Sequence, residues 1–294
     1  PPRSTLEADR RQRQMCIRDR NRPFYRLGDR SDIESGYAVV RVLSGQDIYV
    51  YATVIDNTTG DPTAVPMKVR AGEYHQWIAA AAHSGGAHGS LWRTDVCLLN
   101  RSGTAALAEV IFHRENGDSG SLTIDLVDGQ QVVLGDVVAQ AGMTGSGALE
   151  VVSDQQLLAT SRTYNESGAG TFGLFLDGIS AEDTTSRDTS VWLPQLRQNQ
   201  AFRTNIGLLN TGASRSRVRI LLYDGSGTEL ASTRKTLDPG GWIQLQRPFS
   251  KLAGRNNIDA GYARVEVESG GGVIAYASVI DNATNDGTAI TAKR

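Results

Sequence analysis

The sequence is poor in features that define several common classes of protein. It holds two cysteines, Cys16 and Cys97, in 294 residues, too few for the disulfide framework of a small secreted domain. Its formal net charge of −2 gives no basic surface for nucleic acid or an anionic membrane. No apolar run approaches the roughly 20 residues of a membrane-spanning helix. Cys97 lies in an apolar stretch, so we expect a small buried side chain rather than a reactive thiol.

Local signatures of catalysis are also missing. No Gly-x-Ser-x-Gly turn follows a predicted strand and opens a helix, as the nucleophile of a hydrolase requires. No glycine-rich loop leads into a helix in the manner of a phosphate-binding site. The high glycine count, 32 residues, suggests many turns instead. We therefore predict that the chain is not an enzyme.

One stretch of sequence is present twice. Residues 261–288, GYARVEVESGGGVIAYASVIDNATNDGT, match residues 36–63, GYAVVRVLSGQDIYVYATVIDNTTGDPT, without a gap. A weaker third copy runs from Gly147 to Thr171. The repetition predicts an array of one module.

The spacing of the copies predicts one partial and two complete modules. Residues 1–20 are rich in Arg and end in MCIRDR, which resembles a translated sequencing adapter, so we predict a non-native or disordered tail there. A basic arm for nucleic acid is the alternative. Residues 21–72 match only the C-terminal half of a module and predict a truncated one. Complete modules are predicted over residues 73–183 and 189–294, joined by a polar linker.

The truncated module is expected to be incomplete as a folding unit. Residues 37–43 and 48–56 predict two strands of a closing hairpin, because both are rich in apolar and β-branched residues. Half a sandwich leaves an apolar face and a free strand edge. We therefore expect this part to be poorly ordered or to pack against the next module.

Short apolar runs alternate with turn residues through both complete modules. The run from Trp92 to Asn100 matches the run from Phe202 to Asn210, and each predicts a core strand ended by a turn. The strands predicted at residues 110–113 and 220–223 each lead into a hairpin turn. About seven to nine such strands in each module, without a long amphipathic helix, predict an all-β fold of antiparallel β-sandwiches. A β-propeller is the less favoured alternative, because its blades are shorter.

Three motifs carry a resemblance to known proteins: WRTD with LLN in residues 92–100, LDPGGW in residues 237–242, and GYARVEV with YASVIDNATND after Gly261. With these motifs, the chain from Asn21 onward resembles the immunoglobulin-like repeat modules of large secreted or surface bacterial proteins. The resemblance implies tandem immunoglobulin-like β-sandwiches outside the bacterial cell. It also implies a role as a stalk, spacer, adhesion unit or appendage of an exported enzyme.

We accordingly predict a non-catalytic extracellular repeat array with a structural, spacer or adhesion role. Its expected partners are other modules of the same protein or cell-surface glycans, with no nucleic acid and no membrane span. The alternative is a carbohydrate- or surface-binding appendage of an exported hydrolase whose catalytic domain lies upstream.

The loops after the repeated strand are the first candidates for a site. Their oxygen-bearing side chains suit Ca²⁺, which takes six to eight oxygen ligands, and the candidate ligands are Asp56, Asn57, Asp61, Asp281, Asn282 and Asp286. The middle copy lacks both aspartates, whereas all three copies keep an Asn followed, after five residues, by a Thr. This pattern favours a structural turn capped by the Asn, with no cofactor. A Ca²⁺ site is the alternative.

Two further groups of residues could form a site. His83 and His88, with Asp95 nearby, could ligate Zn²⁺, but their glycine-rich setting favours a surface loop. Trp77 and Trp192 occupy matching positions, which favours core or inter-module packing, and stacking on a sugar ring is the alternative.

Overall fold

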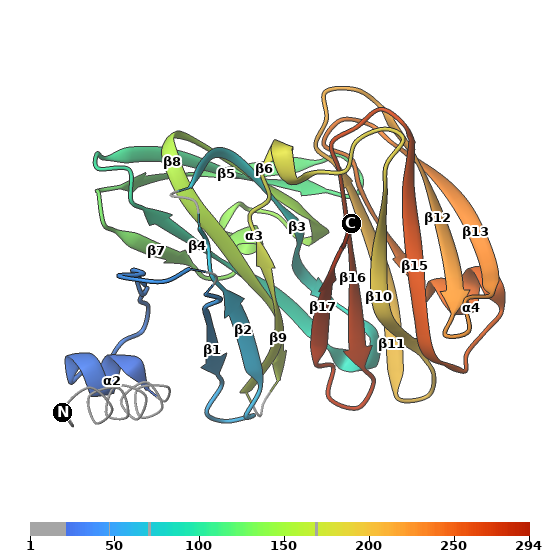
Figure 1. Ribbon diagram of the computed structural model, residues 1–294, viewed down its shortest axis with the longest axis horizontal. Coiled ribbons are helices and arrows are strands. Elements are labelled where there is room, and N and C mark those ends of the chain that lie inside the picture. The colour runs from blue at the N-terminus through green and yellow to red at the C-terminus, as the bar shows by residue number, and fades with distance from the viewer. Residues whose placement is uncertain (1–21, 47, 70–71, 168–169) are drawn as a thin grey trace, which may run out of the picture. The chain divides into compact units, whose positions relative to one another are not determined.

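The computed structural model describes residues 22–46, 48–69, 72–167 and 170–294 (Figure 1). The chain divides into two compact units, one ending at Arg41 and the other running from Val42 to Arg294. In its described part the first unit holds helix α2 (Pro23–Gly28), which has no buried residue. The predicted tail, residues 1–20 with Cys16, lies outside the described residues. None of the described helices is long and apolar enough to cross a membrane.

Most of the second unit is antiparallel β-structure, as predicted. Its central portion, residues 73–177, holds seven strands and the short helix α3 (Val137–Gln140). The strands are β3 (Glu73–Gly85), β4 (Leu91–Asn100), β5 (Ala106–Arg114), β6 (Ser119–Leu126), β7 (Gln131–Leu134), β8 (Gly145–Ser167) and β9 (Gly170–Asp177). They pair in the order β6-β5-β8-β3-β4-β7, and β9 pairs with β8.

The C-terminal portion, residues 190–294, forms two four-stranded sheets. Its elements are β10 (Ser190–Gln198), β11 (Phe202–Asn210), β12 (Ser216–Asp224), β13 (Glu229–Leu237), β14 (Trp242–Gln246), helix α4 (Pro248–Ala253), β15 (Ile258–Ser269), β16 (Val273–Asp281) and β17 (Gly287–Thr291). One sheet has the order β10-β15-β12-β13 and the other the order β14-β11-β16-β17.

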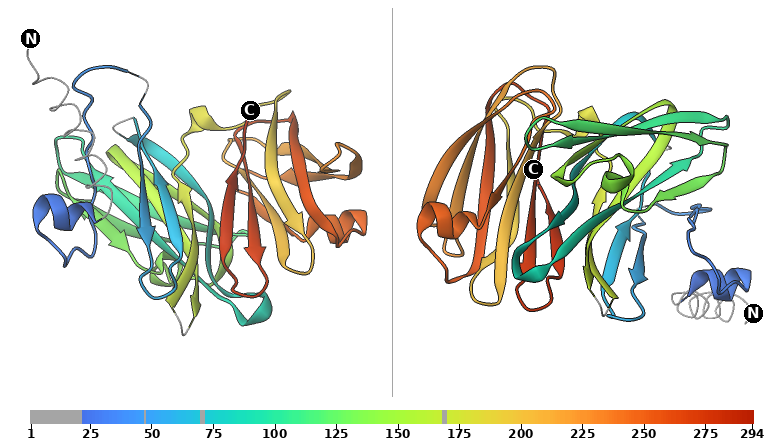
Figure 2. Two further views of the ribbon diagram at one scale, coloured as in Figure 1. Left: turned by 60° about the horizontal axis from the view of Figure 1, so that its bottom comes forward. Right: turned by 180° about the vertical axis from the view of Figure 1, so that it is seen from behind.

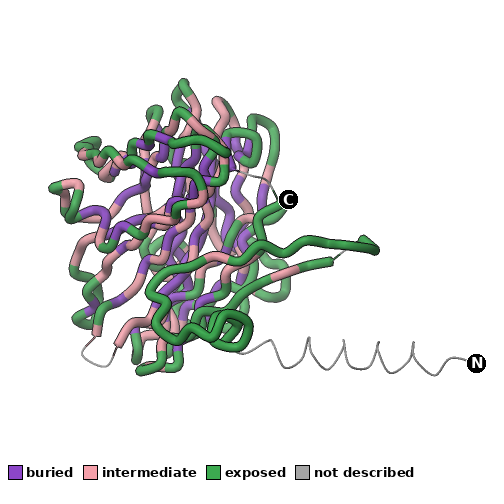
Figure 3. The backbone as a smooth tube through the Cα atoms, turned by 90° about the vertical axis from the view of Figure 1, so that its left-hand side faces the viewer, coloured by how far each residue is buried: buried purple, intermediate pink, exposed green. Residues whose placement is uncertain are grey.

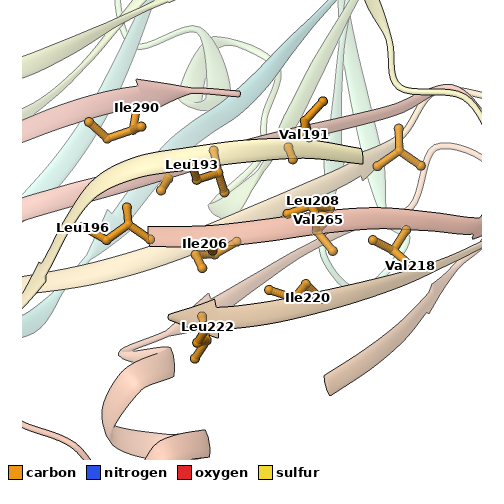
Figure 4. Close-up of a cluster of buried hydrophobic side chains, with 14 of the residues drawn as sticks. Val191, Leu193, Leu196, Ile206, Leu208, Val218, Ile220, Leu222, Val265 and Ile290 are labelled. Carbon is orange, nitrogen blue, oxygen red and sulfur yellow. The ribbon is translucent and has the colours of Figure 1, made fainter. Parts of the chain in front are cut away.

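Alternating side chains of the two sheets of the C-terminal portion meet in one hydrophobic core. Val191, Leu193, Ile206, Leu208 and Val265 are among its members, each almost fully buried (Figure 4). Since successive residues of a strand point to opposite faces, every second residue enters this core. The central portion has a separate core of the same kind. Figure 3 shows buried residues concentrated in the middle of many strands, whereas most loops are exposed.

The predicted closing hairpin is wrong. Strands β15 and β16 follow each other in the chain but lie in different sheets, because β15 pairs with β10 and β12 whereas β16 pairs with β11 and β17. In the central portion the single 23-residue strand β8 occupies the positions of both strands. Its first half pairs with β3 and β5, and its second half with β4 and β9. Both edges of each strand are taken by other strands, so no hairpin forms.

The first copy of the repeat also differs from its prediction. Residues 37–43 form no strand, and the later part of the stretch forms β1 (Tyr51–Ile55), which pairs with β2 (Pro62–Pro66). In the C-terminal portion, β15 contains the residues that match 37–43, and it lies between two partner strands. The described residues before β1 supply no such partners, so the apolar side chains of this segment stay exposed, as Leu43 does at 90%.

Candidate functional site

The carboxylate of Asp56 lies at the tip of the β1–β2 hairpin and accepts hydrogen bonds from four donors. Its Oδ1 accepts from the backbone N–H groups of Thr58 and Thr59, at 2.8 and 3.0 Å. Its Oδ2 accepts from the N–H and hydroxyl of Thr171 on β9, at 3.1 and 2.7 Å. The Thr171 hydroxyl and these N–H groups hold the pKa of Asp56 well below its ordinary value. The carboxylate therefore closes its own turn and fastens the hairpin to the central portion.

Asp61, at the other end of the same loop, is buried and makes a second attachment. Its Oδ2 accepts from the N–H of Gly173 at 2.9 Å and lies 3.3 Å from Nη2 of Arg162 on β8. The guanidinium of Arg162 also donates to the hydroxyl of Thr63, at 3.1 Å. The buried charge of Asp61 is thus paired, as a buried carboxylate requires.

The corresponding loop of the C-terminal portion closes in the same way. Asp281 Oδ1 accepts from the N–H groups of Ala283 and Thr284, at 2.7 and 3.0 Å. Burial, followed by the neighbouring charge of Asp61, raises the pKa of Asp286. The strands that follow the two acidic loops, β2 and β17, both contact β9, although the loops lie far apart in the sequence.

The prediction that the repeated Asn caps these turns is wrong. Asp56 and Asp281 cap the turns of the first and third copies, whereas the repeated Asn of the second and third copies bonds to a neighbouring segment. Asn165 Oδ1 accepts from the N–H of Leu91, the first residue of β4, and Asn282 Nδ2 donates to the carbonyl of Gln200, just before β11. A local pattern could not separate these roles, because the partners of Asn165 and Asn282 lie 74 and 82 residues away in the sequence.

Of the predicted group of His83, His88 and Asp95, the structure brings His83 and Asp95 together through Asp136. His83 Nδ1 lies 2.7 Å from Asp136 Oδ2, which also lies 3.3 Å from Arg93 Nε. Asp95 is next to this pair, since its Oδ1 accepts from the N–H of Asp136 at 2.8 Å and from the hydroxyl of Tyr164 at 3.2 Å.

The remaining histidine, His88, is exposed in a left-handed turn. Among the described residues, no group of three or more His, Cys, Asp or Glu side chains is placed to hold a metal ion. The Zn²⁺ alternative therefore has no ligand set in that part of the chain. Asp136, which the sequence did not single out, is the residue on which the group converges.

A second histidine group was not predicted. Glu150 on β8 lies between His75 and His113, with each Nε2 2.7 Å from one carboxylate oxygen. Burial alone raises the pKa of Glu150, but the hydrogen bonds and charges of His113 and His75 outweigh it, and the net shift is downward. Both imidazole rings also lie against the indole of Trp77, with centroids 5.8 and 5.1 Å away.

Trp77 lies where the central portion meets the C-terminal portion. It is 6% exposed and belongs to a buried cluster drawn from both portions, namely Trp77, Ala79, Ala148, Leu209, Trp242, Ile274 and Tyr276. The indole Nε1 of Trp242 donates to the carbonyl of Ala79 at 2.8 Å. Figure 2 shows the green strands of the central portion beside the orange and red strands of the C-terminal portion. The two portions therefore share a buried contact in which the indole donor is satisfied.

Trp192, at the matching position, lies on an open face and is 38% exposed. Its ring centroid lies 5.7 Å from that of Tyr262 and 6.4 Å from that of Tyr223, and the two Tyr rings stack at 4.8 Å. The guanidinium of Arg264 lies over the indole at 5.4 Å. The prediction of packing thus holds for Trp77, whereas Trp192 remains accessible.

Cavities are small in the described parts of the chain. One beneath the segment between β9 and β10 has a volume of about 110 Å³, and one lined by Met67, Gln76 and Leu158 has about 140 Å³, whereas pockets for small molecules usually exceed about 300 Å³. Cys97 is half-buried, and burial raises the pKa of its thiol to about 11. A thiol with so high a pKa is protonated at neutral pH and is a poor nucleophile.

Comparisons with known proteins give little further guidance. No family model matches the sequence, and neither does any curated protein. Among solved structures, a glycosyl hydrolase family 2 member from Bacteroides cellulosilyticus shares 11% identity over 73% of this chain and 26% of its own, with a TM-score of 0.16. Bacteroides uniformis β-glucuronidase 2 shares 11% identity over 74% of this chain and 25% of its own, with a TM-score of 0.15. The chain thus spans about a quarter of each, and at such TM-scores the likeness carries no argument about function.

Proposed function

We propose that the chain is a non-catalytic array of immunoglobulin-like β-sandwich modules in an exported bacterial protein, where it acts as a structural spacer or adhesion unit. In this reading β1 and β2 belong to a partial module, β3 to β9 form the second module, and β10 to β17 form the third. Support comes from the strand pairing, because each complete module places the same succession of strands around one core.

The observation that carries the proposal is the buried contact between the second and third modules. Trp77 and Trp242 are 6% and 3% exposed, and the only donor on the Trp242 indole is used on the carbonyl of Ala79. A flexible tether between independent domains would leave such side chains in water. Contacts of this kind hold neighbouring modules at a fixed angle, which is what a spacer requires.

Replacing Trp242 with Ala tests this role in the full chain. Truncating a buried Trp costs about 3 to 5 kcal/mol, and here most of that loss falls on the contact between modules. We expect Trp242→Ala to split one cooperative thermal transition into two and to increase the radius of gyration in X-ray scattering. Trp192→Ala is the matched control, since that indole lies outside the contact, and it should change neither. An unchanged scattering curve for Trp242→Ala would remove the basis for a rigid array.

The alternative, a carbohydrate-binding appendage of an exported hydrolase, has one candidate surface, formed by Trp192 and its neighbours. Exposed aromatic rings can stack on sugar rings. Against this use, Arg264 covers one side of the indole, and the two Tyr rings face each other. Titration of the full chain with soluble polysaccharides, followed by tryptophan fluorescence, tests the alternative. A saturable change that Trp192→Ala abolishes would support it.

A further inference from the structure

The contact between the second and third modules defines two complementary faces. The acceptor face belongs to the second module and contains Trp77, Ala79 and Ala148. The donor face belongs to the third module and contains Leu209, Trp242, Ile274 and Tyr276. Ala148 is fully buried, and its small side chain leaves room for the large rings that come from the donor face.

Strand register identifies the same acceptor face on the third module. Trp77 pairs with Glu150, and Trp192 pairs with Arg264. On the adjacent strand His113 pairs with Ala148, and Tyr223 pairs with Tyr262. The matched positions are therefore Trp77 with Trp192, Glu150 with Arg264, His113 with Tyr223, and Ala148 with Tyr262. Within the described residues this second acceptor face is open, with Trp192 38% exposed.

The chain leaves the two acceptor faces by the same route. Ile179, just after β9, forms an isolated bridge with Trp77, and Lys293, just after β17, forms the same bridge with Trp192. From Ile179 the chain continues into the third module and its donor face. A segment attached after Arg294 would thus start from the position at which the third module starts.

The two acceptor faces differ in the room that they offer. Tyr262 stands at the position of Ala148, which in the second module lies in one buried cluster with Trp242 and Tyr276 of the donor face. The third module therefore carries a phenol ring, stacked on Tyr223, where the existing contact has a methyl group. A donor face with a large ring would clash there, and overpacking of this kind costs about 1 to 3 kcal/mol. A donor face with a smaller side chain at that position would fit.

The repeat itself contains such a donor face. In the second module the register places Leu99, Leu158, Gln131 and Thr160 where the third module has Leu209, Ile274, Trp242 and Tyr276. The apolar pair is kept, while Gln131 and Thr160 replace the two rings. At the existing contact, a donor face with large rings packs against an acceptor face with the small residue Ala148. An acceptor face with the large residue Tyr262 requires a donor face with smaller side chains.

We propose that the face around Trp192 is a docking surface for another module of this repeat, one with a small side chain at the position of Trp242. The inference rests on the proposed function, and it adds the partner and the feature that selects it. Tyr262 sets the selection by size, and the Trp192 indole supplies the apolar area that the partner covers.

A size-exchange experiment on the extended full chain tests this proposal. A copy of residues 181–294 is fused after Arg294, either unchanged or with Trp242→Gln in the added copy, and each version is made with Tyr262 or with Tyr262→Ala in the original module. The readout is the accessibility of Trp192 to iodide quenching, isolated by subtracting the emission of the matched Trp192→Phe chain. We expect Trp192 to lose most of its accessibility in two versions, Tyr262 with the Gln copy and Tyr262→Ala with the unchanged copy.

The other two versions should leave Trp192 accessible. Tyr262 with the unchanged copy produces a clash, and Tyr262→Ala with the Gln copy leaves a cavity. Equal burial in all four versions, or burial in none, overturns the proposal, whether or not the added copy folds. Neither result touches the contact between the second and third modules, which the Trp242→Ala measurement on the unextended chain tests separately. Protection of Trp192 by a soluble polysaccharide in the unextended chain would instead assign the face to a glycan.

Discussion

Asn100 and Asn210 are fully buried, and each holds the end of a core strand to a neighbouring turn. Asn210 Nδ2 donates to the carbonyls of Ser214, Leu237 and Asp238, at 2.8 to 3.1 Å. Its Oδ1 accepts from the N–H of Gly212 at 3.0 Å. Asn100 does the same in the central portion, with donors and acceptors at matching positions.

The first prediction concerns this buried amide. In Asn210→Ala the carbonyl of the buried residue Leu237 loses this donor, as do those of Ser214 and Asp238, and an unsatisfied buried polar group costs about 1 to 3 kcal/mol. We expect the free energy of unfolding of the C-terminal portion to fall by about 3 kcal/mol in urea denaturation. Asn116→Ala, in an exposed turn, is the control and should change it by about 0.5 kcal/mol or less. Equal losses in the two variants would contradict a structural role for the buried amide.

The second prediction uses the lowered pKa of Glu150. A carboxylate whose pKa is lower in the folded state stabilises the fold above its unfolded pKa of about 4.3. That stability is lost as the pH falls from the unfolded pKa through the folded one. We compare pH 6 and pH 3, which lie on either side of about 4.3. Between them the wild-type chain should lose more stability than the Glu150→Gln variant does. The measurement is the urea midpoint at each pH, and equal losses would show that His75 and His113 do not act through Glu150.

At the scale of the element, the loop of the β1–β2 hairpin both closes its own turn and attaches the hairpin to β9, whereas its copy after β16 closes its turn. Asp56 and Asp281 occupy matching positions, and both close their own turns through two backbone N–H groups. Asp56 in addition reaches Thr171 on β9. β1 has no buried residue, so these polar bonds, with those of Asp61, fasten the hairpin to the rest of its unit.

The third prediction follows from this difference. Asp56→Ala should release the hairpin without unfolding the cores. We expect amide protons of residues 51–66 to lose their protection in native-state hydrogen exchange, while those of β11 and β16 keep theirs. Asp281→Ala removes the same turn cap in the other copy and should leave residues 51–66 protected. Protection that survives Asp56→Ala would show that another contact anchors the hairpin.

The fourth prediction concerns the whole molecule and Ca²⁺. The carboxylates of Asp56, Asp61 and Asp281 already accept hydrogen bonds from backbone N–H groups, so a cation would have to displace those donors. A ligand that binds only the folded state raises the melting temperature by mass action. We expect the full chain to melt at the same temperature in excess Ca²⁺ and in EDTA. A rise with Ca²⁺ would restore the metal alternative.

Much of the local structure could be predicted. The strands around Trp92–Asn100 and Phe202–Asn210 form where they were expected. The strands predicted at residues 110–113 and 220–223 also form, as parts of β5 and β12, and each leads into a hairpin with the next strand. These features depend on alternation of apolar side chains and on turn residues within a few positions, which a single sequence displays. The failure at residues 37–43 has the opposite cause, since a strand forms only where partner strands accept its backbone hydrogen bonds.

The sequence by itself determined the all-β class, the positions of most strands and the presence of two similar portions, because these follow from local patterns and from repetition. Only the tertiary structure decided that β15 and β16 lie in different sheets, that Asp136 joins His83, and that Trp77 is buried while Trp192 is exposed. Matching residues in a repeat share a local environment but have different neighbours across the fold. Burial and hydrogen bonding depend on those distant neighbours.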